Sequence, residues 1–353
     1  MIRLYEPYIA KNQKKYVNDC LDSNMLTFRG KYNKLFEDKL RETLNTEHVI
    51  LTSNGSVSLY ALFHCLGLKG KKVITQSLNY IATTSQLKLV GADVIFCDFN
   101  KEDLQIDLNH LEKLCRENPF SSVVVSGLYG YCKPMHDIGD ICERYGCQIL
   151  EDAAECFCSY DIDYNQAIGT FGYAGSFSFF ANKIITCGEG GCIVTDEDWL
   201  AERIRKFVDQ SAEGDFWHSG VGTNFRMTNI QAAIGLAQLE DLDLILNKKR
   251  WVSLWYKEKL SQTGLELVSS DATKTNHWMP VYKLPKGTYY NDIKEIAGSF
   301  EIRPIFYRSE NILNQTKCKE FEYFRDKFVI LPCGPNLTEQ EISFICDEIK
   351  KVI

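Results

Sequence analysis

The stretches CQILEDAAECF (147–157) and GSFSFFANKIITCGEGG (175–191) decide the fold of this chain. Each begins with a short run that contains apolar or aromatic residues and then changes abruptly, to acidic residues in the first and to a lysine and glycines in the second. Apolar residues at consecutive positions, rather than at alternate ones, are typical of strands that are buried on both faces. We therefore predict two inner strands of a parallel sheet, with polar side chains gathered where the strands end.

The same pattern recurs on both sides of these stretches. Five further runs are HVILTS (48–53), KVITQ (72–76), DVIFCD (93–98), SVVVSGLY (122–129) and GCIVTD (191–196). Segments with helical spacing separate them, for example the segment with Leu59, Leu62 and Phe63. This alternation predicts an α/β fold with a mostly parallel mixed sheet in a large domain.

The last third of the chain has a different composition. A long helix is predicted from about Thr228 to Leu260, because apolar residues keep a helical spacing there and Gly264 follows. Beyond it, we expect short strands around 278–284 and 328–331 and helices around 291–299 and 338–351. The predicted organisation is a large domain over residues 1–245 and a smaller α+β domain over residues 246–353.

Charge and cysteine usage exclude several classes of protein. The 353 residues carry 40 Lys and Arg against 47 Asp and Glu, so we expect no nucleic acid as a partner. The 14 cysteines are scattered and form no C-x-x-C, and the histidines are dispersed, so we expect no metal site and a cytoplasmic location. No apolar run approaches the roughly 20 residues of a membrane span, and the N-terminus does not resemble a signal peptide.

The stretch TSNGSVSLYALF (52–63) predicts the end of a strand, a tight turn and the start of a helix. Backbone N–H groups at a helix start bind phosphate well. Gly55 would let an anion approach the backbone, and Ser56 could cap it. Taken alone, an ordinary helix N-cap is the simpler explanation of the same residues.

Asp152 lies at the predicted end of a buried strand. A carboxylate there is costly unless it has a partner, and a cationic ring nitrogen of a bound cofactor would be such a partner. Ala153 and Ala154 leave room for a flat group, and Glu155 follows. Alternatively, Asp152 caps a helix that follows it.

Lys183 follows an aromatic-rich strand and precedes a glycine turn. If it is partly desolvated, its amine is neutral and nucleophilic for more of the time, as Schiff-base chemistry requires. Ser178 could add a hydroxyl to a phosphate site. A lone lysine is most often a solvated surface group, so this interpretation depends on its neighbours.

The stretch GVGTNFRMTNIQAAIG (220–235) carries Asn224 and Arg226 just before the long helix. Arginine readily binds a phosphate or a carboxylate. Alternatively, Arg226 forms a surface ion pair, and Thr228 and Asn229 cap the helix. Taken in order, a phosphate turn, a strand-end aspartate, and a serine and lysine after another strand are the groups that pyridoxal 5′-phosphate (PLP) requires.

Over nearly its whole length, the chain resembles the DegT/StrS-type sugar aminotransferases, which are PLP enzymes of the aspartate-aminotransferase fold (fold type I). The resemblance is carried by MLTFRGKYNKLFE (25–37), the NGS turn, GLYGYCKPM (127–135), EDAAE (151–155), SFSFFANKIITCGEGG (176–191), GTNFRMTNIQAAIG (222–235) and LPCGPNLTEQEI (331–342). The pairing of EDAAE with SFSFFANK and GEGG is specific.

The resemblance implies a role for each matched residue. Lys183 would bind the cofactor covalently as an aldimine and, once freed, move protons. Asp152 would pair with the pyridine nitrogen, and Glu155 would hydrogen-bond near the 3-hydroxyl. The phosphate and ring contacts would come from Gly55, Ser56 and Ser178, from Asn224 of a second subunit, and from Tyr80 and Ala154 on the two ring faces. For Tyr80, an ordinary core aromatic is the alternative.

The resemblance also implies the reaction. Dehydratases of this fold have a histidine in place of the aldimine lysine, so Lys183 favours transamination. The stretch FFANKIITCGEGG (179–191) is closer to enzymes that aminate C4 of 4-keto-6-deoxy nucleotide sugars, such as perosamine or viosamine synthases. A 3-ketosugar aminotransferase, a PLP enzyme that acts on amino acids, and a non-catalytic sensor or scaffold stay open as alternatives.

Two departures from the family pattern bear on the substrate. Gln76 stands where the family usually has proline, and RSEN (308–311) stands where Pro-Leu-His is common. We expect Arg226 and Tyr307 to contact the substrate. The expected protein is a cytoplasmic homodimer with shared active sites, which transfers an amino group from glutamate to a nucleotide-linked keto-deoxysugar.

Overall fold

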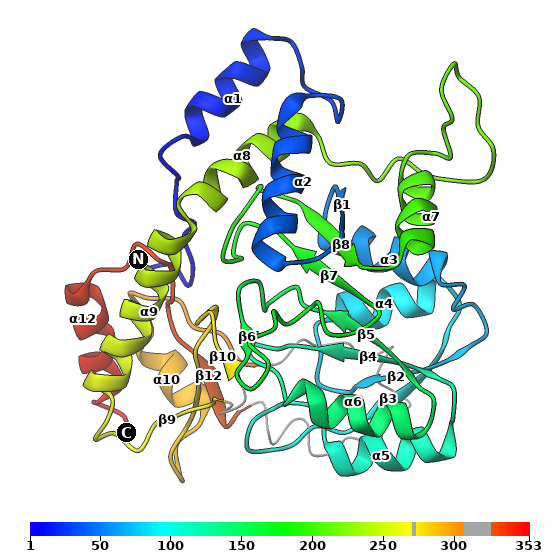
Figure 1. The fold of residues 1–353 in the computed structure, drawn as a ribbon. Helices are drawn as coiled ribbons and strands as arrows, with labels where there is room; N and C mark the ends of the chain where they lie inside the picture. The colour runs from blue at the N-terminus through cyan, green and yellow to red at the C-terminus, as the bar shows by residue number, and fades with distance from the viewer. Residues whose placement is uncertain (270–272, 306–325) are drawn as a thin grey trace.

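The computed structural model describes residues 1–269, 273–305 and 326–353, and a seven-stranded sheet forms its centre (Figure 1). The order is β1-β8-β7-β5-β4-β2-β3, with β1 (His48–Thr52), β2 (Lys72–Gln76), β3 (Asp93–Cys97), β4 (Ser122–Ser126), β5 (Gln148–Asp152), β7 (Ala174–Ser178) and β8 (Gly191–Thr195). The strands from β7 to β3 pair in parallel, whereas β8 is antiparallel to both β7 and β1. The predicted α/β fold with a mostly parallel mixed sheet is confirmed.

Helices cover both faces of this sheet, which explains its apolar runs. Along β4, Val123 and Val125 belong to one apolar cluster and Val124 to another. The first cluster includes side chains of α2 (Lys31–Leu44), α5 (Leu108–Glu117), α6 (Met135–Arg144) and α8 (Asn229–Glu240). The second includes side chains of α3 (Gly55–Cys65), α4 (Ile81–Leu89) and α7 (Asp198–Val208). Both faces of each inner strand are therefore buried.

The predicted long helix is divided in two. α8 ends at Glu240 and α9 (Leu242–Lys259) follows, while Asp241 between them has a non-helical backbone. Contacts with the start of the chain fix this break, because the backbone N–H of Lys11 donates to Asp241 and Tyr16 donates to Glu240. Tyr16 belongs to α1 (Gln13–Asp22). Apolar spacing continues across the break, so a periodicity argument could not find it.

The last third of the chain forms a small antiparallel sheet with its own apolar cluster. Its order is β12-β11-β9, with β9 (Glu266–Leu267), β11 (Val281–Lys283) and β12 (Phe328–Ile330), and α9, α10 (Tyr290–Ile296) and α12 (Glu339–Ile349) pack with it. Ile2 pairs with Phe300, so the first residues of the chain join this unit. A further pair, β6 (Tyr160–Asp161) with β10 (Thr273–Lys274), links it to the large sheet's loops. The domain boundary at 245/246 stays a prediction.

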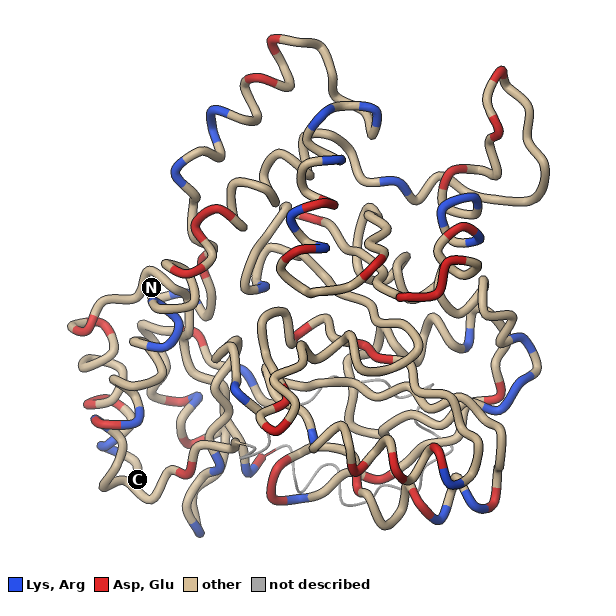
Figure 2. The backbone as a smooth tube through the Cα atoms, in the orientation of Figure 1, with Lys and Arg blue, Asp and Glu red and all other residues tan. Residues whose placement is uncertain are grey.

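The charge of the described surface is mixed. Figure 2 shows Lys and Arg interspersed with Asp and Glu along the outer helices. Among the described residues, no helix combines the length and the apolar character that crossing a membrane requires.

Candidate active site

A cavity of 540 Å³ opens where β2, β4, β5 and β7 end. Eight of the residues singled out from the sequence line it, and they are Gly55, Ser56, Tyr80, Asp152, Ala154, Glu155, Ser178 and Lys183. They come from four separate segments, and the parallel strands bring these segments together at one edge of the sheet. The structure therefore brings these eight residues together, and their roles stay predictions.

The start of α3 forms one wall of this cavity. The side chain of Asn54 accepts a hydrogen bond from the backbone N–H of Val57 at 3.0 Å, so Asn54, and not Ser56, caps the helix. A Cβ atom added to Gly55 would lie 2.7 Å from Cβ of Ser178. Glycine is needed at this position because the end of β7 approaches the helix start so closely. The backbone N–H groups of Gly55 and Ser56 at this helix start, together with the hydroxyls of Ser56 and Ser178, are suited to a phosphate.

Asp152 closes the bottom of the cavity at the end of β5. The hydroxyl of Thr83 donates to one of its carboxyl oxygens, and the backbone N–H of Ala154 donates to the other at 3.2 Å. Burial raises the pKa of Asp152, and these two hydrogen bonds and the charge of Lys183 offset part of the effect. A turn and not a helix follows Asp152, so the alternative of a helix cap is wrong.

The amine of Lys183 lies inside the cavity, with 13% of its side chain exposed, so the alternative of a solvated surface lysine is wrong. Its Nζ atom lies 3.9 Å from Oε1 of Glu155. Burial lowers the pKa of Lys183 and raises the pKa of Glu155 to about 7. The other carboxyl oxygen of Glu155 accepts a hydrogen bond from the N–H of Tyr129 at 2.8 Å. The amine therefore spends more time neutral, and hence nucleophilic, than an exposed lysine does.

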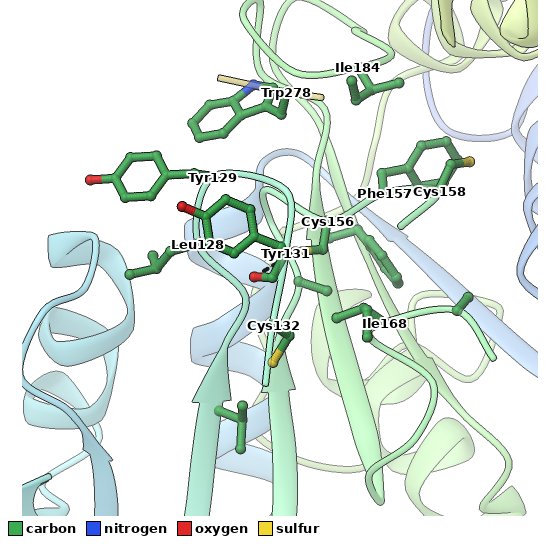
Figure 3. Packing of buried hydrophobic residues seen from close by; sticks show 14 of the residues in the cluster. Leu128, Tyr129, Tyr131, Cys132, Cys156, Phe157, Cys158, Ile168, Ile184 and Trp278 are labelled. Carbon is green, nitrogen blue, oxygen red and sulfur yellow. Dashed lines mark hydrogen bonds between the residues drawn. The ribbon is translucent and has the colours of Figure 1, made fainter. Parts of the chain in front are cut away.

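Several residues that line the cavity were not predicted from the sequence. Asn79, Ser126, Asn182, Glu189, Trp278 and Arg303 also line the cavity. Asn79 and Asn182 adjoin Tyr80 and Lys183, so proximity to predicted residues was a usable signal. Trp278 and Arg303 belong to the last third of the chain and carry no local motif. Trp278 belongs to the same apolar cluster as Leu128, Tyr129 and Tyr131 of the loop after β4 (Figure 3).

Two polar atoms of the cavity residues lack partners within the described part of the chain. The side-chain oxygens of Asn79 and Asn182 are buried and accept no hydrogen bond there. Buried polar atoms are normally paired, so these two indicate room for a polar ligand. The set of groups that PLP needs is completed by the helix start at Gly55, where a Cβ atom would fill the space, by a buried aspartate, and by a buried lysine whose pKa is lowered. The residues present thus fit this cofactor.

Asn224 and Arg226 do not reach this cavity within one chain. The guanidinium group of Arg226 pairs with Asp209, donates to Oδ1 of Asn224 at 3.0 Å, and lies 4.1 Å from the ring centroid of Phe28. In the single chain, Arg226 therefore forms the ion pair that the alternative interpretation expected. Thr228 caps α8 through a capping box with Gln231, as the alternative for this segment expected. Tyr307 lies outside the described residues.

A mixed sheet of this topology, with a buried lysine facing a buried aspartate across the cavity at the strand ends, defines the class of fold-type-I PLP enzymes. The chain belongs to the DegT/DnrJ/EryC1/StrS aminotransferase family, whose model matches residues 7–350. The family predicted from the sequence motifs is confirmed, and PLP is the cofactor on which its aminotransferases depend.

Individual relatives cover the chain from end to end. A GDP-perosamine synthase of Escherichia coli O157:H7 is 33% identical over 99% of this chain and 98% of its own length. The structure of Helicobacter pylori PseC, an aminotransferase involved in pseudoaminic acid biosynthesis, matches with a TM-score of 0.91 at 24% identity, over 99% of this chain and 98% of that one. An E. coli GDP-4-keto-6-deoxy-D-mannose-3-dehydratase with bound hydrated PLP matches with a TM-score of 0.88 at 21% identity, over 99% of each chain. The two structural matches show the shared fold.

Proposed function

We propose that this protein is a PLP-dependent aminotransferase that converts a 4-keto-6-deoxy nucleotide sugar to the 4-amino-4,6-dideoxy sugar, with glutamate as amino donor. One observation carries the proposal, namely the buried amine of Lys183 beside Glu155 and Asp152 in a cavity that ends at a helix start. The full-length similarity to a GDP-perosamine synthase supports the choice of substrate class. The presence of a lysine at position 183 supports transamination over dehydration.

Lys183 has two tasks in this proposal. Its neutral amine would hold PLP through the cofactor's aldehyde, and once released the same amine would be placed to carry a proton to or from the donor's Cα. Both tasks need an amine that loses a proton more readily than an exposed lysine does, and burial, which lowers the pKa of Lys183, acts in that direction. Glu155 accepts or shares that proton, since its carboxyl group is buried 3.9 Å away. PLP supplies an electron sink when it is bound.

The remaining cavity residues hold and orient the cofactor. Asp152 would pair with the pyridine nitrogen and favour its protonated form, and the hydroxyl of Thr83 fixes this carboxyl group. Gly55, Ser56 and Ser178 would contact the phosphate, and Tyr80 and Ala154 the two faces of the ring. Each assignment follows from the position of the side chain on the cavity wall and from the family pattern.

We assign part of substrate binding to Arg303, which sequence reasoning did not single out. Lys183 and Arg303 are the two cationic side chains among the described cavity residues, and Arg303 is exposed at the cavity wall. A guanidinium group binds phosphates and carboxylates in a bidentate manner. Arg303 is therefore suited to the diphosphate of the nucleotide sugar or to a carboxylate of glutamate. Arg226 and Tyr307 stay candidates for substrate contact.

We further propose that the enzyme is a homodimer in which Asn224 of one subunit completes the phosphate site of the other. Within one chain, Asn224 lies away from the cavity. The segment between α7 and α8 projects from the molecule (Figure 1) and carries the exposed side chains of Phe216 and Trp217. Large aromatic side chains on a projecting segment are typical of contacts between subunits.

The experiment that tests this function is turnover of a panel of nucleotide sugars. The protein, loaded with PLP, is incubated with glutamate and 4-keto-6-deoxy sugars linked to UDP, dTDP or GDP, and the products are analysed by mass spectrometry and NMR. We expect an amino group at C4 and no product with Lys183→Ala. An amino group at C3 would favour the 3-ketosugar alternative. Turnover without any sugar would favour an amino-acid enzyme, and cofactor binding without turnover would favour a sensor or scaffold.

A further inference from the structure

Lys249 on α9 is a buried lysine that the proposed function does not use. Only 1% of the residue is exposed. Within the described residues, no carboxylate oxygen lies within 4.0 Å of its amine. An ammonium group that is buried without a counter-charge is costly, so the groups that receive it are informative.

Three distant segments of the chain converge on this amine. Nζ of Lys249 donates to the backbone carbonyl of Trp278 at 2.7 Å and to that of Cys333. The same atom lies 5.0 Å from the ring centroid of Tyr5. Carbonyl oxygens and an aromatic face can stabilise a cation in place of water. Lys249 therefore joins the start of the chain, the segment before β11 and the segment after β12.

Two of these three partners also hold the turn that carries Lys183. The hydroxyl of Tyr5 donates to the carbonyl of Lys183 at 2.8 Å. The indole N–H of Trp278 donates to the carbonyl of Asn182 at 2.6 Å. Nζ of Lys183 itself lies 4.1 Å from the centroid of the Trp278 ring. The indole thus fixes the backbone of the turn and also forms a wall against the reactive amine.

The amine of Lys249 holds the carbonyl of Trp278, the residue that carries the indole, and the backbone N–H of Trp278 donates to Oδ1 of Asn276 at 2.9 Å. Loss of Lys249 would remove the hydrogen bond that this carbonyl accepts, and with it the link between the Trp278 segment and Tyr5. Other ionisable groups face the two lysines. Asp152, Glu155 and Cys156 act on Lys183, and Cys333 and His277 interact with Lys249.

We propose that Lys249 is a positioning residue that holds the Trp278 indole against the amine of Lys183, and through it sets the geometry and proton affinity of that amine. This inference deepens the proposed function and rests on it for the role of Lys183. A purely structural lysine would stabilise the fold without any effect on Lys183. A lysine that acted through space would affect Lys183 in the opposite direction, because removal of a positive charge favours the ammonium form of a neighbour.

The test measures Lys183 in the cofactor-free protein. Competitive acetylation at a series of pH values, followed by peptide mass spectrometry, gives the pH midpoint of its amine. We compare Lys249→Met, Trp278→Leu and the double variant, with Arg250→Met as the control, since Arg250 is the exposed neighbour on the same helix. Thermal unfolding is recorded for each variant.

We expect Lys249→Met and Trp278→Leu each to lower the midpoint by about 0.5 to 1.5 pH units, because the indole face stabilises the ammonium form. The double variant should show no further shift, since both changes remove the same contact. In the loaded enzyme, Lys249→Met should lower kcat about tenfold and leave KM unchanged. Arg250→Met should match the wild type.

Three results would overturn the proposal. They are a midpoint that rises in Lys249→Met, a double variant whose shift is the sum of the two single shifts, and an unchanged midpoint with only a lower Tm. If Lys249→Met does not fold, Lys249→Gln keeps a donor for the carbonyls without the charge, and the same comparison applies. The acetylation readout needs neither PLP nor substrate, so failure of the proposed function would leave it interpretable.

Discussion

Nζ of Lys183 and Oε1 of Glu155 lie 3.9 Å apart inside the protein, close enough to form an ion pair. Burial acts against both charges, because it lowers the pKa of Lys183 and raises the pKa of Glu155 to about 7, and each charge offsets part of this effect on the other. An exposed pair of the same residues would remain ionised at neutral pH. The burial of these two residues therefore brings their pKa values closer together than in an exposed pair.

The first prediction concerns the pH dependence of stability that Glu155 causes. Its pKa in the folded protein, about 7, is above the ordinary value of 4.5. Such a group contributes stability that is fully present below pH 4.5 and is lost as the pH rises through about 7. We predict that the Tm of the cofactor-free wild type, relative to that of Glu155→Gln, falls as the pH is raised from about 5 to about 8.

The control for this comparison is Glu143→Gln, which changes an exposed glutamate in α6. Its Tm should follow that of the wild type over the whole range. The prediction fails if the wild-type Tm minus the Tm of Glu155→Gln stays constant or rises over this pH range. Either result would show that the pKa of Glu155 is not raised in the folded protein.

The second prediction concerns Gly55. A methyl group at this position would lie 2.7 Å from Cβ of Ser178, so Gly55→Ala must push the start of α3 away from the end of β7. Overpacking of this kind costs about 1–3 kcal/mol, and we expect roughly 5- to 150-fold weaker binding of PLP if the displaced groups hold its phosphate as proposed. Fluorescence titration of the cofactor-free protein with PLP measures the effect.

Gly298→Ala is a matched control, because a Cβ atom there meets nothing within 4 Å. It should bind PLP as the wild type does. Unchanged affinity in Gly55→Ala would place the phosphate elsewhere in the cavity.

Single residues differed in how well the sequence predicted them. Asp152 and Lys183 could be found because each follows a buried strand, where a charged side chain needs an explanation. Asn54 caps α3, as the alternative of an ordinary N-cap allowed, and a role of Ser56 toward a phosphate stays a prediction. Trp278 and Arg303 could not be found, because only the folding of the last third onto the large sheet brings them to the cavity.

Among the elements, β5 has a second buried carboxylate, that of Glu151, which holds the loop before β7 in place. Glu151 accepts hydrogen bonds from three backbone N–H groups, those of Gly169, Phe171 and Gly172. These groups belong to the loop that leads into β7, the strand that ends at Ser178. One side chain therefore ties the loop before β7 to the strand that carries Asp152.

The third prediction follows from this arrangement. Glu151→Gln replaces one acceptor oxygen by an NH₂ group, which faces a donor and leaves at least one buried N–H without a partner. We predict a loss of about 1–3 kcal/mol in the free energy of unfolding. Urea denaturation of the cofactor-free protein measures this loss, and Glu143→Gln again serves as the exposed control. A variant as stable as the wild type would mean that the loop finds other acceptors.

Helices and strands were predicted well where the apolar pattern was continuous. They were predicted poorly where contacts between distant parts of the chain determine their ends. The inner strands β4 and β5 follow directly from apolar runs, because both of their faces are buried. The break between α8 and α9 at Asp241 depends on bonds from Lys11 and Tyr16, which are far away in the sequence. No local pattern reports such bonds.

At the scale of the whole molecule, the described chain forms most of the proposed site but leaves Asn224 outside it. The segment between α7 and α8 projects with Phe216 and Trp217 exposed. If two chains exchange these segments, each cavity is completed by its partner, and activity requires both subunits.

The fourth prediction tests this exchange with two inactive variants. Lys183→Ala lacks the reactive amine, and Asn224→Ala lacks the residue that the partner would supply. In a mixed dimer, one of the two sites contains neither change, so mixing under conditions of subunit exchange should restore about a quarter of the wild-type activity. As a control, the double variant carries both changes in one chain, and mixing it with Lys183→Ala should restore nothing. No recovery in the first mixture would show that Asn224 acts within its own subunit or not at all.

The central claim is that Lys183 is the residue that binds PLP covalently, and the most direct test identifies the modified lysine. The loaded protein is reduced with borohydride, digested and mapped by mass spectrometry. We predict a single pyridoxyl phosphate group, on the peptide that contains Lys183. A loaded protein in which Lys183 is unmodified, or in which another lysine carries the group, would contradict the account.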